Sequence, residues 1–295
     1  MNHMINPFPK VIEFQTHNMC NANCIICPYS TLQHTRNIME DDLFRKIIIE
    51  CKENKIERLV PYLNNEPFLD KTFVSKLQFI RKELPNIELE ISTNASLLTK
   101  EIIKDLSKIN LTELRISVFG FTGALHKKIM PGVSHEKVFT NVELIAKYFE
   151  KSSCLVSIVM IDNGDIDEIE FEQMDKYSKS LGFNFFRWGF LDRANNVKDF
   201  SNVYYDAKAH YCEQRRPLER MHILTNGDVI FCCQDWGHEE IVGNISNQTL
   251  KEVWNSRFYN LKREQLYSPE KEAPEICKRC ILSKGCDIYD RKNSL

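Results

Sequence analysis

Three cysteines near the N-terminus constrain this chain more than any other feature. They are Cys20, Cys24 and Cys27, in the run Cys-Asn-Ala-Asn-Cys-Ile-Ile-Cys. Iron–sulfur clusters prefer soft thiolate ligands, so three thiolates on one short loop can hold three irons of a four-iron cluster. The next cysteine, Cys51, is distant in sequence, and the fourth iron is therefore expected to stay open for another ligand. A zinc loop and unconnected structural cysteines are the alternatives that this spacing leaves open.

The pattern of apolar residues predicts the fold around this loop. Segments rich in β-branched and aromatic residues alternate with amphipathic segments. The expected strands are 11–17, 58–63, 87–93, 113–119, 154–161 and 184–190, and the expected helices are 40–54, 71–84, 99–109, 135–149 and 166–181. This alternation favours an α/β fold whose right-handed crossovers wind a parallel sheet into a barrel or part of one. Ligands bind at the C-terminal ends of such strands, and the cysteine loop directly follows the first strand.

A smaller second domain is expected where the alternation stops. Residues 191–211 resemble a connecting segment. A hairpin is predicted for 221–224 and 229–232 because Asn226-Gly227-Asp228 is a strong turn signal. One amphipathic helix is predicted for 249–266. We therefore divide the chain into residues 1–190 and a small α+β domain of residues 191–295.

A second set of cysteines lies in this smaller domain. Its members are Cys212, Cys232, Cys277, Cys280 and Cys286, with Gly227 between the first two. Paired cysteines around a hairpin suit an iron–sulfur cluster, and a tetrahedral zinc ribbon is the alternative.

The composition narrows the cellular setting and the partners. The formal net charge is −2, which gives no basic surface for nucleic acid or membrane. The chain has no run of eighteen apolar residues and no charged-then-apolar signal pattern at its N-terminus, so a cytoplasmic protein is expected. In that compartment, eleven cysteines indicate metal ligands rather than disulfides.

The two cysteine sets together resemble the radical S-adenosylmethionine (radical SAM) enzymes that carry a C-terminal SPASM or shorter twitch-type domain. The resemblance implies a partial (β/α)6 TIM-like barrel whose first [4Fe–4S] cluster binds the amino and carboxylate groups of S-adenosylmethionine. It also implies one auxiliary [4Fe–4S] cluster, with Cys212, Cys232, Cys277 and Cys280 as its ligands. The full SPASM pattern has two further cysteines, but Asp290 occupies the first of those positions and the sequence ends before the second. Cys286 is then surplus, or a ligand in place of one of the four.

Shorter motifs extend the resemblance to the cofactor site. The segment Asn64-Asn65-Glu66-Pro67 is similar to the Gly-Gly-Glu-Pro segment that binds the amino group of S-adenosylmethionine in this family. Ser92 and Asn94 resemble residues near the ribose and methionine end of the cofactor, and Ser117 resembles a serine beside its carboxylate. Ile26 stands where the family usually has an aromatic residue near adenine. Surface turns and ordinary polar strand ends are the alternatives for these motifs.

Two residues of the second domain are candidates for catalysis. Cys233 and Asp235 follow the expected ligand Cys232, at a place where some relatives carry an acid–base residue. Asp235 could accept a proton during substrate oxidation, and Cys233 could donate a hydrogen atom to a substrate radical. The alternative is a small buried thiol and a turn aspartate.

The order of the motifs resembles that of the aminocyclitol dehydrogenases of this family. The resemblance implies hydrogen abstraction from a hydroxylated small molecule, an aminocyclitol or sugar, with dehydrogenation or epimerisation as the outcome. A flavodoxin- or ferredoxin-type protein would supply the electron. Only about nineteen residues precede Cys20, which leaves no room there for a peptide-recognition domain and favours a small substrate. A maturase that crosslinks or epimerises a ribosomally made peptide is the second hypothesis, and a non-catalytic electron carrier or zinc module is the third.

Overall fold

The computed structural model describes residues 6–32, 35–197 and 204–285. The chain forms two compact units. Unit 1 comprises Met1–Phe14, Met39–Ile56 and Leu191–Leu295, and unit 2 comprises Gln15–Ile38 and Glu57–Phe190. One boundary between the units lies between Phe190 and Leu191, and unit 1 also contains the first strand and the first helix.

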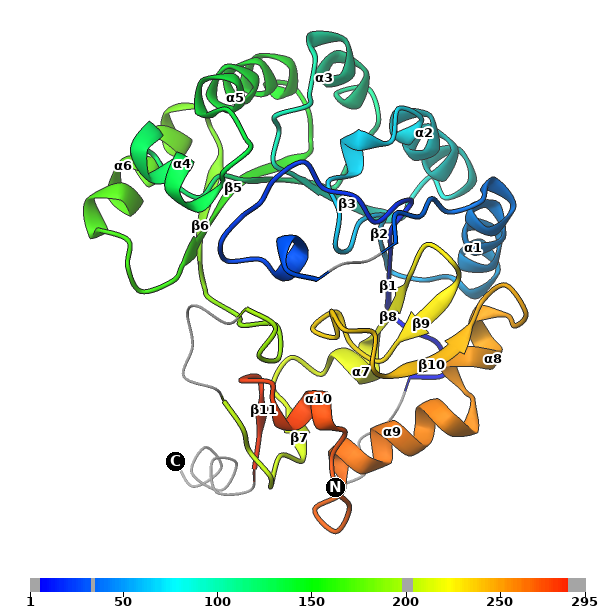
Figure 1. Cartoon of the computed structure of the whole chain (residues 1–295). Helices are drawn as coiled ribbons and strands as arrows, with labels where there is room; N and C mark the ends of the chain where they lie inside the picture. Colours follow the sequence, from blue (N-terminus) through cyan, green and yellow to red (C-terminus); the bar gives the residue numbers. More distant parts are fainter. Residues whose placement is uncertain (1–5, 33–34, 198–203, 286–295) are drawn as a thin grey trace, which may run out of the picture. The chain divides into compact units, whose positions relative to one another are not determined.

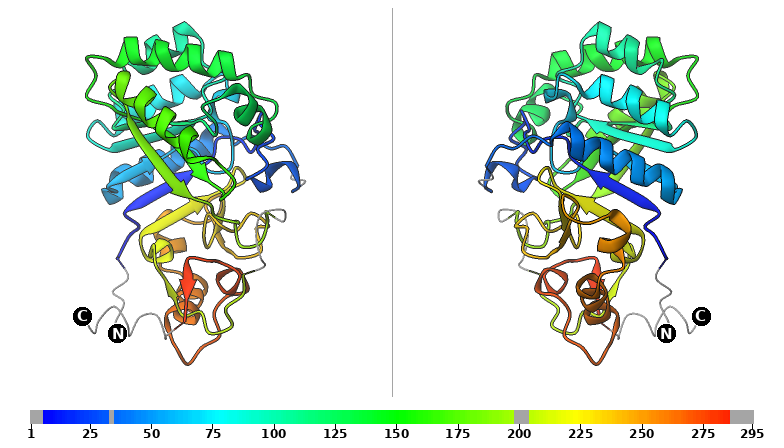
Figure 2. Two further views of the ribbon diagram at one scale, coloured as in Figure 1. Left: turned by 90° about the vertical axis from the view of Figure 1, so that its left-hand side faces the viewer. Right: turned by 90° about the vertical axis from the view of Figure 1, so that its right-hand side faces the viewer.

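Unit 2 is built on a parallel sheet. Its strands, in spatial order, are β2 (Arg58–Val60), β3 (Glu88–Thr93), β4 (Glu113–Ser117), β5 (Leu155–Asp162) and β6 (Asn184–Gly189). The connecting helices are α2 (Phe73–Glu83), α3 (Lys100–Leu106), α5 (His135–Phe149) and α6 (Glu168–Ser180). These helices lie along one side of the sheet (Figures 1 and 2). This is the arrangement that right-handed crossovers produce.

Unit 2 contains one helix that the sequence did not predict. It is α4 (Gly123–Ile129), and it begins where the Thr122 side chain accepts a hydrogen bond from the backbone N–H of Leu125. Its seven residues are too few for a clear 3.6-residue period, so the sequence pattern did not indicate it.

The strands of unit 2 have one apolar face and one mixed face. Apolar residues such as Leu114, Ile116 and Ile158 are completely buried. Successive side chains of a strand point to opposite faces, so polar and aromatic residues share the other face. We call this the inner face, and it carries Glu90, Ser92, Arg115, Ser117, Phe186 and Trp188. Burial of the apolar face stabilises the sheet and leaves the inner face for polar groups.

Unit 1 contains a small mixed sheet. Strand β1 (Val11–Phe14) pairs in parallel with β8 (Arg220–Ile223), which is followed by the antiparallel strands β9 (Asp228–Ile230) and β10 (Ile241–Asn244). The pair β8–β9 is the hairpin that the Asn-Gly-Asp turn predicts. A second antiparallel pair joins β7 (Tyr211–Cys212) to β11 (Ser283–Lys284). The helices are α1 (Asp41–Asn54), α7 (Arg216–Glu219), α8 (Leu250–Trp254), α9 (Arg257–Tyr267) and α10 (Glu275–Lys278).

Long-range contacts explain why the first helix belongs to unit 1. The Lys46 ammonium of α1 donates to the carbonyl oxygen of Gln248 at 2.6 Å, and the Glu50 carboxylate accepts from the backbone N–H of Leu250 at 2.6 Å. About 200 residues separate these partners in sequence, so no local pattern predicts the grouping.

The expected single helix over 249–266 is wrong, because α8 and α9 are separate helices. Helix α8 ends at Trp254, and Asn255 is the residue that follows it. The hydroxyl of Ser256 then accepts from the backbone N–H of Tyr259 and starts α9. Serine at an N-cap favours a new helix start over continuation of the old helix.

The observed elements confirm the α/β fold class. Strands and helices alternate along residues 11–190 as in a partial TIM barrel, and a small C-terminal region adds antiparallel strands. Within the described residues, the helices are all too short or too polar to span a membrane.

Candidate functional site

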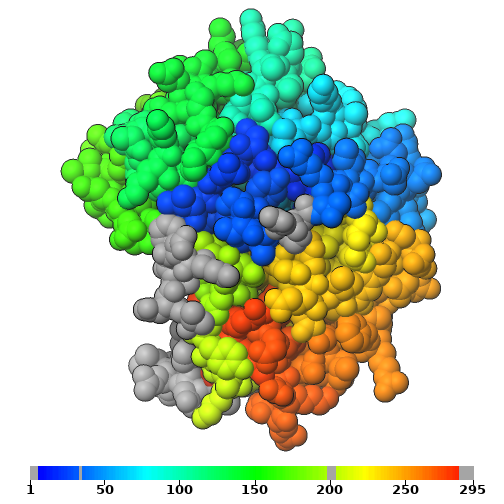
Figure 3. Space-filling model, viewed as in Figure 1, coloured from blue at the N-terminus to red at the C-terminus, as the bar shows by residue number. Residues whose placement is uncertain are grey.

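The N-terminal cysteine loop of unit 2 is fixed by backbone hydrogen bonds. It precedes a 3-10 turn, η1 (Pro28–Ser30). Asn23 N–H donates to the carbonyl of Pro131 at 2.9 Å, and Ile25 N–H donates to the carbonyl of Ile129 at 3.0 Å. These bonds hold the loop against the C-terminal end of α4. Part of the loop, in dark blue, lies at the surface of the molecule in Figure 3.

The three cysteines of this loop are half-buried. Burial raises the pKa of Cys20 to about 12, and burial also raises the pKa of Cys24. Cys27 lies near both, since its charge contributes to each shift. A bound metal must therefore stabilise the thiolates by displacing their protons, as thiolate-ligated metals do.

The separation of the sulfur atoms distinguishes a cluster from a single zinc ion. A zinc ion with Zn–S bonds of about 2.3 Å places its tetrahedral sulfur ligands about 3.8 Å apart. Over residues 6–32, 35–197 and 204–285, the one group of three or more ligand atoms that all lie within 4.8 Å is that of Glu13, His222 and Cys233. Among the described cysteines, neither set has three sulfur atoms that all lie within 4.8 Å of one another, as a zinc site would. Each thiolate of a four-iron cluster binds a different iron, so a wider spacing fits that group.

Glu66 joins three segments of unit 2. It is 2 % exposed, and its backbone N–H donates to the carbonyl of Met19 in the cysteine loop at 3.0 Å. Its carboxylate accepts from the Thr93 hydroxyl at 2.7 Å, from the backbone N–H of Asn94 at 2.8 Å and from that of Phe68 at 3.2 Å. Burial raises the pKa of Glu66 to about 7. The carboxylate therefore joins the end of β3 to the turn after β2, and the backbone N–H of Glu66 joins this turn to the cysteine loop.

The rest of the Asn64-Asn65-Glu66-Pro67 segment lies at the same place. Asn64 N–H donates to Gln15 Oε1 at 3.2 Å, and the Asn65 side-chain oxygen accepts from Leu63 N–H at 3.1 Å. Pro67 is buried and opens the 3-10 turn η2 (Pro67–Leu69). Asn65 Nδ2 is buried without a hydrogen-bond partner among the described residues. This donor is available to a polar group of a bound ligand.

Side chains of the third strand end bind the cysteine loop directly. Asn94 Nδ2 donates to Asn21 Oδ1 at 3.0 Å, and Asn21 Nδ2 donates to the Ser96 hydroxyl at 2.9 Å. The Ser96 hydroxyl in turn donates to Asn94 Oδ1 at 2.6 Å. Neither Asn21 nor Ser96 stood out in the sequence, because a lone Asn or Ser has no distinguishing pattern.

The remaining cofactor candidates occupy unit 2 as follows. Ser92 and Ser117, at the ends of β3 and β4, bring their hydroxyl oxygens within 3.5 Å of each other on the inner face. Ile26 is buried within the loop, 7 % exposed. The structure thus gathers the loop, Glu66, Asn94 and the two serines at the C-terminal ends of the strands, which is where ligands bind in such sheets.

The inner face also carries an aromatic pair that the sequence pattern did not indicate. Phe186 and Trp188 of β6 are stacked with ring centroids 6.4 Å apart, and they are 37 % and 41 % exposed. The Arg115 guanidinium lies 5.3 Å from the Trp188 ring centroid. Arg187, between them in sequence, instead lies over Phe171 of α6 at 3.9 Å, so it points to the helix side. Aromatic residues in a strand normally indicate a buried position, so the sequence did not suggest that this pair is exposed.

The C-terminal cysteines of unit 1 surround a small pocket. Cys212, Cys232, Cys277 and Cys280 line it together with Arg216 and Gln234. Cys212 and Cys232 come from the edge of β7 and the turn after β9, whereas Cys277 belongs to α10 and Cys280 follows that helix. All four are at least 90 % buried. Cys286 and Asp290 lie outside the described residues.

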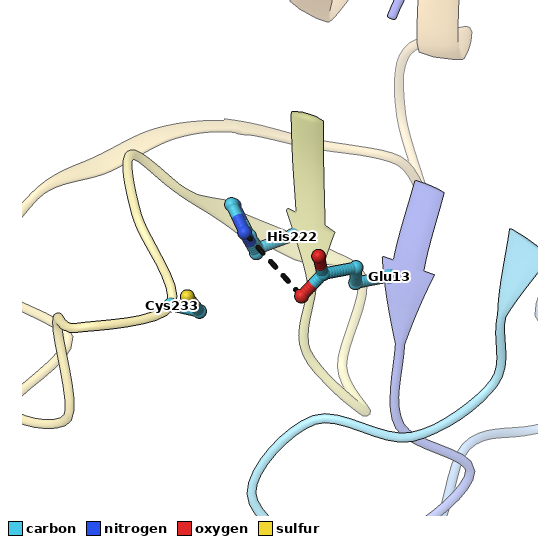
Figure 4. A group of neighbouring side chains, drawn as sticks. All are labelled: Glu13, His222 and Cys233. Atoms are coloured by element: carbon cyan, nitrogen blue, oxygen red, sulfur yellow. Dashed lines mark ion pairs between the residues drawn. The ribbon is translucent and has the colours of Figure 1, made fainter. Parts of the chain in front are cut away.

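The neighbouring Cys233 belongs to a different group. Its sulfur accepts a hydrogen bond from Arg216 Nη1 at 3.0 Å. His222 and Glu13, which face each other across β8 and β1, lie beside it, with 3.5 Å between His222 Nε2 and Glu13 Oε2 (Figure 4). A hydrogen bond with Cys232 and the Arg216 charge lower the pKa of Cys233.

The side chain of Asp235 binds backbone groups of its own turn. It is completely buried, and its two carboxylate oxygens accept the backbone N–H groups of Glu239 at 2.9 Å and Glu240 at 2.8 Å. Burial raises the pKa of Asp235. The carboxylate thus closes the turn that follows Cys232.

Comparison with known families and proteins agrees with this geometry. The profile of the radical SAM superfamily matches residues 14–173, and the profile of the SPASM iron–sulfur cluster-binding domain matches residues 212–281. The chain is 21 % identical over 274 residues to the S-adenosyl-L-methionine-dependent 2-deoxy-scyllo-inosamine dehydrogenase of Niallia circulans, and the match covers 92 % of each protein. It is 27 % identical over 114 residues to the putative peptide biosynthesis protein YydG of Bacillus subtilis strain 168, covering 37 % of this chain and 36 % of YydG.

Two solved structures share the fold. BtrN in complex with AdoMet and 2-DOIA superposes with a TM-score of 0.65 and 16 % identity, covering 94 % of each chain. SuiB of Streptococcus suis bound to the precursor peptide SuiA superposes with a TM-score of 0.73 and 18 % identity, covering 98 % of this chain and 74 % of SuiB.

Proposed function

Because this chain belongs to the radical SAM superfamily, we propose that it removes hydrogen from a hydroxylated small molecule, an aminocyclitol or sugar, and dehydrogenates or epimerises it. Its cofactors are S-adenosylmethionine and two [4Fe–4S] clusters. The observation that carries the choice of substrate class is the match to the inosamine dehydrogenase, which runs over 92 % of both proteins.

The residues of unit 2 fit the first cluster and S-adenosylmethionine. Cys20, Cys24 and Cys27 would hold the cluster. When bound, this pair of cofactors supplies a 5'-deoxyadenosyl radical. Glu66 and the unpartnered Asn65 Nδ2 would receive the polar end of the methionine group. The segment Asn64-Asn65-Glu66-Pro67, together with Ser92, Asn94, Ser117 and Ile26, would complete the cofactor site.

The inner face of unit 2 offers a place for the substrate. The exposed ring of Trp188 presents an apolar surface against which the C–H face of a cyclitol or sugar can pack. The Glu90 carboxylate accepts hydrogen bonds from the side chains of Tyr62, Arg58 and Arg115. These groups therefore form a fixed polar layer. Substrate hydroxyls can then reach Ser92 and Ser117, two positions further along β3 and β4.

The residues of unit 1 fit the auxiliary cluster. Cys212, Cys232, Cys277 and Cys280 would be its ligands, because they line one pocket. Dehydrogenation removes a hydrogen atom, a proton and an electron from a carbinol group, and this pocket is where the electron acceptor would lie. In epimerisation the substrate loses no net electron, because the Cys233 thiol would return a hydrogen atom to the substrate carbon. The thiyl radical left on Cys233 would then take up one proton and one electron, the electron coming from the flavodoxin- or ferredoxin-type reductant.

A specific observation supports a second candidate, the maturation of a ribosomally made peptide. SuiB, solved in complex with the precursor peptide SuiA, shares the fold over 98 % of this chain, and YydG bears the name putative peptide biosynthesis protein. A peptide side chain could also pack against Trp188.

The deciding experiment measures 5'-deoxyadenosine release by the anaerobically reconstituted protein, given S-adenosylmethionine and a strong reductant such as reduced flavodoxin. Cofactor cleavage is expected, and aminocyclitols should accelerate it more than peptides do. The variant with Cys20, Cys24 and Cys27 all replaced by Ala should not cleave the cofactor. Cleavage by that variant would overturn the assignment of the first cluster, and acceleration by peptides alone would favour the maturase.

A further inference from the structure

One arginine shares the pocket of the second cysteine set. Arg216 is the first residue of α7 and lines the same pocket as Cys212, Cys232, Cys277 and Cys280. An arginine keeps its positive charge throughout the physiological pH range. The pocket therefore combines four potential thiolates with one fixed cation. In the sequence Arg215-Arg216-Pro217, nothing distinguishes this arginine from a surface charge.

Two residues that follow Cys232 hold the guanidinium of Arg216 in place. Nη1 donates to the sulfur of Cys233 at 3.0 Å, and it also donates to the side-chain oxygen of Gln234 at 2.7 Å, with the Gln234 amide oriented to satisfy its hydrogen bonds. The same Gln234 oxygen accepts from Arg193 Nη1 at 2.9 Å. Gln234 is 2 % exposed, so this support has little freedom to move.

The carboxylate of Glu13, whose charge acts on Arg216, has its own cationic partner. Glu13 Oε1 accepts from Arg220 Nη1 at 2.5 Å, and its other oxygen faces His222 (Figure 4). Two arginines therefore contact the group of Glu13, His222 and Cys233, which makes it a network of ion pairs and hydrogen bonds rather than a site for a further cation. Glu13 is thus paired with Arg220, whereas Arg216 contacts Cys233 and lines the cysteine pocket.

We propose that Arg216 is a positioning residue for the auxiliary cluster, whose fixed charge on the pocket wall favours the reduced cluster and raises its reduction potential. The proposal rests on the ligand assignment given above. One added electron makes the cluster more negative, and a fixed neighbouring cation stabilises that state more than the oxidised one. A higher potential helps this site to accept the electron that dehydrogenation releases.

The test uses the full chain with Cys20, Cys24 and Cys27 replaced by Ala, so that the auxiliary cluster is the remaining cluster. Its reduction potential is measured by a redox titration followed by electron paramagnetic resonance, with the iron content measured in parallel. Four proteins are compared in this background: the unaltered chain, Arg216→Met, Arg216→Lys and Arg257→Met. Arg257 is exposed at the start of α9 and is the matched control for the loss of one positive charge.

The expected results separate the charge of Arg216 from its shape. Arg216→Met should decrease the equilibrium constant for one-electron reduction about tenfold, which corresponds to a potential about 59 mV more negative. Arg216→Lys and Arg257→Met should stay within about threefold of the parent, since Lys keeps the charge and position 257 is screened by solvent. Should Arg216→Met lose its iron while Arg216→Lys keeps it, the charge is needed to hold the cluster rather than to set its potential, and the proposal is overturned.

Three other results would overturn the proposal. They are an unchanged potential in iron-loaded Arg216→Met, an equal change in Arg257→Met, and loss of iron in both Arg216→Met and Arg216→Lys. A different result tests the ligand assignment: absence of iron in the parent itself would show that the four cysteines do not hold a cluster, whatever Arg216 does.

Discussion

The Glu66 carboxylate accepts a hydrogen bond of 2.8 Å from the backbone N–H of Asn94. This single contact joins the turn after β2 to the end of β3, and the side chain of Asn94 extends the connection to Asn21 in the cysteine loop. The site residues are thus coupled to one another by the protein's own hydrogen bonds. Such coupling reduces the conformational entropy that binding must overcome.

Replacing Glu66 by Gln should change the pH dependence of stability. The folded pKa of Glu66, about 7, lies above its ordinary value of 4.5. Between these values the folded protein holds more protons than the unfolded one, so the free energy of unfolding decreases as the pH rises from 4.5 to 7, by about 3 kcal/mol in total. Urea unfolding of the metal-free protein at pH 5 and pH 7.5 measures this. Glu66→Gln should remove this decrease. The control is Glu88→Gln, which removes an exposed carboxylate and should leave the decrease unchanged. An undiminished decrease in Glu66→Gln would show that the raised pKa does not belong to Glu66.

Replacing Gly132 by Ala should disturb the cysteine loop. Gly132 has φ +91°, and an added Cβ would lie 3.1 Å from the carbonyl oxygen of Asn21. Gly164 has φ +87° but nothing within 4 Å, so Gly164→Ala carries the same backbone strain without the contact. Each substitution should cost about 1 kcal/mol of stability. Iron content after reconstitution should fall only in Gly132→Ala, and equal iron contents would show that the loop tolerates the contact.

Replacing Asp235 by Asn should reduce stability more than catalysis. The amide keeps the shape of the carboxylate but weakens the two hydrogen bonds from Glu239 and Glu240, at a cost of about 1–3 kcal/mol. Thermal unfolding and the rate of product formation per iron-loaded protein are the measurements. A normal unfolding temperature combined with a large loss of turnover would instead identify Asp235 as the base that takes the substrate proton.

Replacing Cys233 by Ala should separate the two possible outcomes of the reaction. Dehydrogenation should continue, whereas epimerisation should stop and an oxidised or dehydrated shunt product should appear. Product analysis in D2O measures this, because a thiol that exchanges with solvent would deliver deuterium to the substrate. Loss of iron in this variant would mean that Cys233 is a cluster ligand and that the assignment of Cys232 is incorrect.

Replacing Trp188 by Ala should weaken substrate binding on the inner face. Loss of the exposed ring should raise KM by up to about tenfold, corresponding to the 0.5–1.5 kcal/mol of an aromatic contact. Trp188→Phe should recover most of the effect. Cofactor cleavage without substrate should be unchanged in both variants. A KM unaffected by Trp188→Ala would place the substrate elsewhere.

Local sequence was enough to predict most elements of unit 2. The strand period of two residues and the helix period of 3.6 residues depend only on residues close together in sequence. The bounds of β3, β5 and α5 could therefore be predicted to within about a residue. It did not predict α4, which is too short for a clear period, or the break at Ser256, where a hydroxyl starts a new helix.

The sequence by itself determined the chemistry of the chain: thiolates spaced for iron, and a Glu-Pro turn after a strand. Only the tertiary structure decided what surrounds them. It placed Arg216 on the wall of the cysteine pocket and Glu13 beside His222, which is more than 200 residues away. It also left Trp188 exposed although its sequence resembles core. Spacing along the chain specifies which ligand atoms are near each other, but the charges and surfaces around them depend on contacts that folding makes between distant segments.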